Sequence, residues 1–112
     1  MTSESRLPQP KRVAPPNVPP VVLGRVRIEV IQWGRSRGLG QNGGYIAAID
    51  VGTGRQLWTL KVYDVTYDPH MEEDVQDVFI ETMEAEDGKL AIEDEAGRRY
   101  LVDPQTRTVA TR

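Results

Sequence analysis

The eleven residues from Ala48 to Trp58 constrain the fold more than any other part of the chain. Their order is Ala-Ile-Asp-Val-Gly-Thr-Gly-Arg-Gln-Leu-Trp, so a short apolar run leads into a small polar turn and returns to a tryptophan. Asp50 suits the start of this turn, because its carboxylate can accept hydrogen bonds from backbone amides just ahead of it. The stretch therefore predicts a β-hairpin with Trp58 as its apolar anchor.

Similar turn signals recur every eight to twelve residues after this hairpin, and no segment has the apolar period of a helix. This cadence is typical of an all-β fold. The strands that we expect beside the first one are 45–51, 56–65, 78–83, 89–93, 99–102 and 108–110.

The first expected strand is long and covers residues 21–33. Val26, Ile28 and Val30 alternate with charged residues, as in a half-buried strand, but the apolar series then continues one residue later at Ile31. A slip of one residue turns a strand over, so the pattern predicts a bulge near Val30–Ile31.

A faint internal repeat extends the hairpin signal to the second half of the chain. Residues 49–55 are echoed by residues 102–107 at an offset of 53 residues, and each copy has an Asp followed three residues later by a Thr. We therefore predict an all-β fold, a small antiparallel meander sandwich or partly open barrel built from two blade-like hairpin units. Two units cannot close a propeller, which needs about four. They either pack on each other, which we favour, or leave a face or strand edge that another chain covers.

The first hairpin also resembles a known family. The residues that carry this resemblance are Ala48, Asp50, Thr53, Gly54 and Trp58, which match the repeat of quinoprotein-type β-propellers at these spacings. The resemblance implies that Trp58 docks on a neighbouring sheet and that Gly54 permits the turn. Some such propellers are dehydrogenases that enclose pyrroloquinoline quinone and calcium in a complete ring of blades, and others are cofactor-free scaffolds. Because 112 residues are too few for such a ring, we carry over structural residues alone and expect no cofactor.

Composition divides the chain into an arm and a domain. Six of the eight prolines fall in residues 1–20, which we expect to be a flexible proline-rich arm, and residues 21–112 form the expected all-β domain. No apolar run approaches the roughly 20 residues that span a bilayer, and the N-terminus lacks the apolar stretch of a secretory signal. We therefore expect a cytoplasmic protein without membrane contact.

Charge is divided as well. Residues 1–63 carry nine Lys/Arg and three acids, whereas residues 64–112 carry five Lys/Arg and fourteen acids. Such an asymmetry can orient the protein toward a partner or toward a second copy of itself. Solubilising charge on strands and loops explains it equally well.

The glycine-rich loop Gly34–Gly44 contains one candidate site. Its G-x-G-x-x-G spacing matches dinucleotide-binding folds, but a strand follows it where those folds need a helix, so we expect no nucleotide there. Arg35 and Arg37, with the neighbouring Trp33, are candidate contacts for an anion or an acidic partner surface.

The acidic loop Asp64–Asp77 is the other candidate, with Asp68 and His70 as its possible interaction residues. It lacks the ligand order of a calcium loop, and one histidine among scattered carboxylates makes a poor transition-metal site. We expect a solvated loop or a short helical turn around 71–76, and no bound metal.

Neither catalysis nor nucleic-acid binding is expected. The chain has one histidine and no cysteine, which excludes Cys–His chemistry and disulfides, and the acidic half would repel phosphates. The sequence therefore predicts a non-enzymatic protein-interaction or accessory module, with a protein partner or a homo-oligomer as its assembly. The alternative is a small-ligand or metal-ion binding module that uses the Gly34–Gly44 or the Asp64–Asp77 loop.

Overall fold

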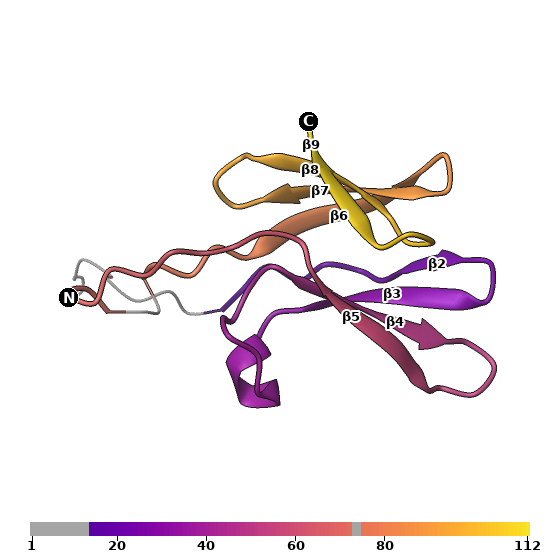
Figure 1. Ribbon diagram of the computed structural model, residues 1–112, viewed down its shortest axis with the longest axis horizontal. Helices are drawn as coiled ribbons and strands as arrows, with labels where there is room; N and C mark the ends of the chain where they lie inside the picture. Colours follow the sequence, from indigo (N-terminus) through magenta and orange to yellow (C-terminus); the bar gives the residue numbers. More distant parts are fainter. Residues whose placement is uncertain (1–13, 73–74) are drawn as a thin grey trace, which may run out of the picture.

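The computed structural model describes residues 14–72 and 75–112, which form two four-stranded antiparallel sheets (Figure 1). The strands of the first sheet are β2 (Val21–Leu23), β3 (Val26–Ile31), β4 (Tyr45–Asp50) and β5 (Gln56–Lys61). Those of the second are β6 (Ile80–Glu86), β7 (Lys89–Asp94), β8 (Arg99–Asp103) and β9 (Thr108–Thr111). Strand order follows chain order in both sheets, so each sheet is a meander. The all-β prediction of two blade-like units is confirmed.

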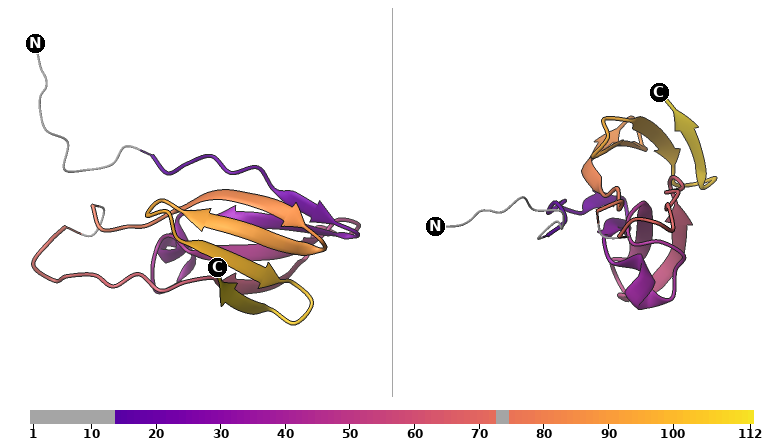
Figure 2. Two further views of the ribbon diagram at one scale, coloured as in Figure 1. Left: turned by 90° about the horizontal axis from the view of Figure 1, so that it is seen from above. Right: turned by 90° about the vertical axis from the view of Figure 1, so that its left-hand side faces the viewer.

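The two sheets pack face to face around one core, and β2 lies beside β6 (Figure 2). In β7 the burial alternates strictly, so one face of the strand points into the core. The fully buried aliphatic side chains of this core come from both sheets, and they include Ile28, Ile46, Ile80, Leu90, Ile92 and Val102. Burying one such side chain contributes about 1.5–3 kcal/mol, so this shared core is what holds the sheets together.

The long strand expected over residues 21–33 is wrong, because a tight turn divides it into β2 and β3. Leu23 pairs with Val26 across this turn, and Gly24 has a positive φ of 63° that suits glycine. The hairpin gives the first meander its fourth strand.

The bulge expected near Val30–Ile31 is also wrong. The pairing of β3 with β4 runs without a shift to Ile31, opposite Tyr45. Both residues are apolar because both faces are covered here: Val30 packs on the main core, and Ile31 joins a small second cluster with Tyr45 and Ala47. The irregularity lies instead between β4 and β5, next to Ala48.

The two turns that the repeat predicted have the same geometry. Gly54 donates its amide to the carbonyl oxygen of Asp50 at 2.7 Å, and Arg107 donates to that of Asp103 at the same distance. Gly54 and Arg107 both have positive φ, 76° and 56°. Each turn joins the third and fourth strands of its sheet, so the two units are alike in construction.

The two units also differ in which face of the sheet points to the shared core. Val102 faces the shared core, whereas Ile49, its counterpart in the first unit, packs on the opposite side of its own sheet beside Ala47. A two-fold sandwich would turn both counterparts inward. The two sheets are therefore not related as the halves of a two-fold sandwich.

Residues 14–20 form no strand, but they lie against the domain. Val18 packs on the core, and the side-chain amide of Gln32 donates to the carbonyl oxygens of Pro16 at 3.0 Å and Ile80 at 3.2 Å. The rest of the expected arm, residues 1–13, lies outside the described residues.

The domain has two unlike ends (Figure 1). The hairpin end, on the right, carries the four tight turns within the two meanders. The loop end, on the left, carries residues 32–44, the connection 62–79 between the sheets, and the turn from β7 to β8.

Candidate functional site

At the loop end, the glycine-rich loop packs directly on the connection between the sheets. The loop begins with a single 3-10 turn, η1 (Gly34–Arg37), and it closes where Gly34 donates its amide to the carbonyl oxygen of Asn42 at 2.9 Å. A Cβ atom at Gly43 would lie 2.3 Å from the carbonyl oxygen of Val78, so only glycine fits there. Glycine at this position therefore allows the backbone of the loop to pack closely on the backbone of the connection.

A polar network around the buried Asp77 carboxylate locks these two segments together. The carboxylate of Asp77 accepts hydrogen bonds from the side-chain amide of Asn42 at 3.1 Å and from the Tyr67 hydroxyl at 2.5 Å. Burial, followed by the hydrogen bond to Asp77, raises the pKa of Tyr67 to about 12. Gln41, also buried, donates to the carbonyl oxygen of Tyr63 and accepts from the amide of Val65, both at 2.9 Å.

Two exposed side chains are held on this base. Trp33 is 49% exposed, and its ring packs edge-on against the buried ring of Phe79, with the centroids 5.6 Å apart. The Arg35 guanidinium lies over the Tyr67 ring, 4.8 Å from its centroid, and its Nε donates to the carbonyl oxygen of Gly40 at 3.3 Å. Both contacts restrict the side chains that they involve.

The other residues predicted as interaction sites lie at the same end. Arg37 ends η1 and is exposed. Asp68 and His70 are exposed in the connection, where the Asp68 carboxylate accepts the His70 amide at 2.9 Å. The structure therefore brings Arg35 against the acidic connection through Tyr67, whereas Asp68 and His70 bond within their own turn.

The sequence did not identify Gln76, which organises that turn. Its side chain bonds with the amide and the carbonyl oxygen of Asp68, and it donates to the carbonyl oxygens of Met71 and Glu72. No helical turn forms in the described part of residues 71–76. Within the described ranges, no three His, Asp or Glu side chains gather as they would to hold a metal ion.

The hairpin end has a different feature, a cleft between the two sheets with a volume of about 450 Å³. Its lining is mainly apolar and includes Leu23, Val26, Ile28, Trp58, Pro104 and Gln105. Trp58 is partly buried and packs on the shared core, and the Arg107 guanidinium of the second unit lies 6.0 Å from its ring centroid. The sequence could not place this cleft, because it depends on the distance between two units.

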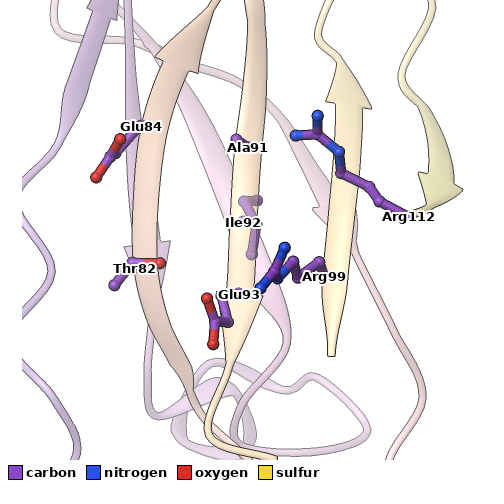
Figure 3. Close-up of a pocket in the computed structure, with 7 residues that line it drawn as sticks. All are labelled: Thr82, Glu84, Ala91, Ile92, Glu93, Arg99 and Arg112. Atoms are coloured by element: carbon purple, nitrogen blue, oxygen red, sulfur yellow. The ribbon is translucent and has the colours of Figure 1, made fainter. Parts of the chain in front are cut away.

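A third feature is a shallow polar depression of about 210 Å³ on the outer face of the second sheet (Figure 3). Glu84 of β6 and Glu93 of β7 lie on one side of it, and Arg99 of β8 extends toward Glu93. Arg112 also borders it, but its guanidinium is already paired with both carboxylate oxygens of Glu86, at 2.9 and 3.2 Å.

No protein-family model matches the chain, and no curated protein sequence does so either. In the part of the chain that the structure describes, no helix is long and apolar enough to cross a membrane.

Proposed function

We propose that this protein is a non-enzymatic protein-interaction or accessory module whose loop end binds its partner. The observation that carries the proposal is the pair Trp33 and Arg35, which are exposed and yet held by Phe79 and Tyr67. Tryptophan and arginine are the side chains most enriched among the residues that dominate binding energy at interfaces. A side chain that is already fixed also loses less conformational entropy on binding.

The partner chemistry follows from these residues. The indole of Trp33 needs an apolar pocket, and Arg35 with Arg37 favours carboxylates around it. A second copy of the chain offers carboxylates at its own acidic connection, where Asp68 and Glu72 are exposed. A homo-oligomer is therefore one form of the proposed assembly, and a different acidic protein is the other.

The small-ligand or metal-ion alternative has less support at these loops. Asn42 and Tyr67 already bond to the buried Asp77, so a ligand would have to replace satisfied hydrogen bonds. The quinoprotein-type resemblance remains a proposal about the scaffold: Ala48, Asp50, Thr53, Gly54 and Trp58 would keep their structural roles, without the cofactor.

The test compares the loss of one equally exposed apolar side chain at each end of the molecule. Wild type, Trp33→Ser and a control, Val51→Ser, are examined by native mass spectrometry over a concentration series and by affinity capture from the source cells. Val51 has the same 49% exposure but lies in the hairpin turn between β4 and β5. Assembly or capture that persists in Val51→Ser and is lost in Trp33→Ser supports the proposal. If all three proteins assemble and capture identically, the loop end is not the binding surface.

A further inference from the structure

We infer that the hairpin-end cleft is a binding site for a small amphipathic carboxylate, a molecule with a flexible apolar body and one anionic head. The site is separate from the proposed protein interface, which lies at the other end of the domain. Its volume of about 450 Å³ falls within the range of small-molecule pockets, about 300–1,000 Å³. Eight residues line it, far fewer than the roughly 20–30 residues on each side of a stable protein–protein interface.

The walls of the cleft favour a ligand with an apolar body. Leu23, Val26 and Ile28 of the first unit face the cleft on one side, and Pro104 of the second unit faces it on the other. Val26 and Leu23 are partly buried hydrophobic residues that pack against the core, so the cleft is a continuation of the core toward solvent. An aliphatic chain placed here removes its own surface and that of the walls from water, which is favourable at about 25 cal/mol per Å².

The polar groups at the cleft can donate hydrogen bonds. They are the indole N–H of Trp58 and the side-chain amide of Gln105, both of which belong to residues that line it. Arg107 forms no ion pair within the described part of the chain, and its guanidinium lies over the ring of Trp58. These donors suit an acceptor that is negatively charged.

Charged side chains of both signs surround the mouth. Arg25 stands between two residues of the wall, and its guanidinium reaches the turn at Gly52, where the Asp50 carboxylate also lies. The nearest acid of the second unit, Asp103, turns its carboxylate into its own hairpin, where it accepts the Gln105 amide at 3.0 Å. Asp87 and Lys89 flank the β6–β7 turn with opposite charges, so Arg107, which lies over the ring of the lining residue Trp58, is the cation that favours an anion in the cleft.

The experiment uses decanoate as the probe, with decan-1-ol and decylammonium as probes of equal chain length, all below their micellar concentrations. The full chain carries Trp33→Phe, which keeps a ring against Phe79 and leaves Trp58 as the single tryptophan reporter. We expect saturable binding of one decanoate per chain with a change in Trp58 emission. Decan-1-ol is expected to bind about five-fold more weakly, and decylammonium more weakly still.

Three variants locate the site. Gln105→Glu adds a carboxylate of the same shape at an exposed position and is expected to weaken decanoate binding about five-fold or more. Arg107→Gln is expected to weaken it about five-fold and to remove the preference over decan-1-ol. Arg99→Gln makes the same charge change on the outer face of the second sheet and is expected to leave binding unchanged.

Three results would overturn the inference. They are the absence of saturable decanoate binding, equal binding of the three probes, and an equal loss in Arg99→Gln and Arg107→Gln. Unfolding midpoints of the variants show whether each is folded, and Gln105→Glu keeps the test decisive if Arg107→Gln is not. A Trp33→Ser protein that loses its partner and still binds decanoate separates this site from the proposed interface.

Discussion

Replacing Asp94 with alanine is expected to remove the strongest single polar anchor of the second sheet. Asp94 ends β7 and is 1% exposed, and its carboxylate accepts four hydrogen bonds. The donors are the amides of Ala96 and Arg98, at 2.9 and 3.0 Å, the Arg98 Nε at 3.0 Å, and the Tyr100 hydroxyl at 2.9 Å. The alanine side chain can accept a hydrogen bond from none of these donors.

The magnitude follows from where each donor lies. The Tyr100 hydroxyl is buried, so losing its partner costs about 1–3 kcal/mol. The two amides belong to an exposed turn where water can replace the carboxylate, which limits each loss to about 0.5–1 kcal/mol. The Arg98 side chain is 56% exposed, and its ion pair contributes about 0–1 kcal/mol. We therefore expect Asp94→Ala to lower the free energy of unfolding by about 3 kcal/mol.

Urea unfolding followed by far-ultraviolet circular dichroism measures this loss. With an m-value of about 1–3 kcal/mol/M, the midpoint is expected to fall by more than about 1 M. Two control variants separate the contributions of the individual donors. Arg98→Ala removes only the exposed ion pair and should cost less than about 1 kcal/mol. Tyr100→Phe removes the buried hydroxyl and should cost about 1–2 kcal/mol. If Asp94→Ala costs no more than Arg98→Ala, the buried carboxylate does not anchor the sheet.

Three further predictions concern the pH dependence, the repeated turn and the N-terminal segment. Burial and the neighbouring carboxylates raise the pKa of Tyr67 and of Tyr100 from 10 to about 12, so the folded state favours the neutral phenol. The resulting stabilisation is complete below pH 10 and is lost as the pH rises toward 12. Urea midpoints and phenolate absorbance measure this loss, and titration of both tyrosines as free phenols would contradict it. Gly54→Ala is expected to cost about 1 kcal/mol because φ is positive, whereas Arg107→Gly in the equivalent turn should be neutral or slightly stabilising; equal losses would contradict the equivalence of the turns. Gln32→Ala is expected to cost about 1–2 kcal/mol and to release residues 14–20 to proteolysis, and unchanged cleavage would show that this side chain does not hold them.

Local patterns predicted much of the fold because turn chemistry is short-range. Asp50 and Gly54 determine one hairpin, and Asp103 with Thr106 predicted its counterpart although an arginine occupies the positive-φ position there. The same reasoning misses the turn at Gly24, because no second turn residue accompanies the glycine. The sequence therefore predicts one long strand where the structure has β2 and β3.

The slip at Ile31 shows where pattern reasoning fails for a physical reason. A strand with one covered face alternates strictly, and a departure from alternation then indicates a bulge. In β3 the departure arises because the glycine-rich loop covers the second face, with Leu39 packed on the cluster that contains Ile31. Which face a distant loop covers is a property of the tertiary structure. The same limit applies to the candidate site. The sequence identified Trp33 and Arg35, but it did not identify Phe79, on which Trp33 packs, or Tyr67, over which Arg35 lies.

The form of the sheets also limits how copies of this chain can assemble. The glycine-rich loop covers part of the outer face of the first sheet, and the outer face of the second is lined by charged residues, so neither offers a bare apolar face for another blade. The two outer edges are poor templates for strand addition, because β5 is irregular next to Trp58 and β9 is only four residues long. A second copy is therefore expected to dock through the loop end, where Trp33 is exposed, rather than by extending a sheet.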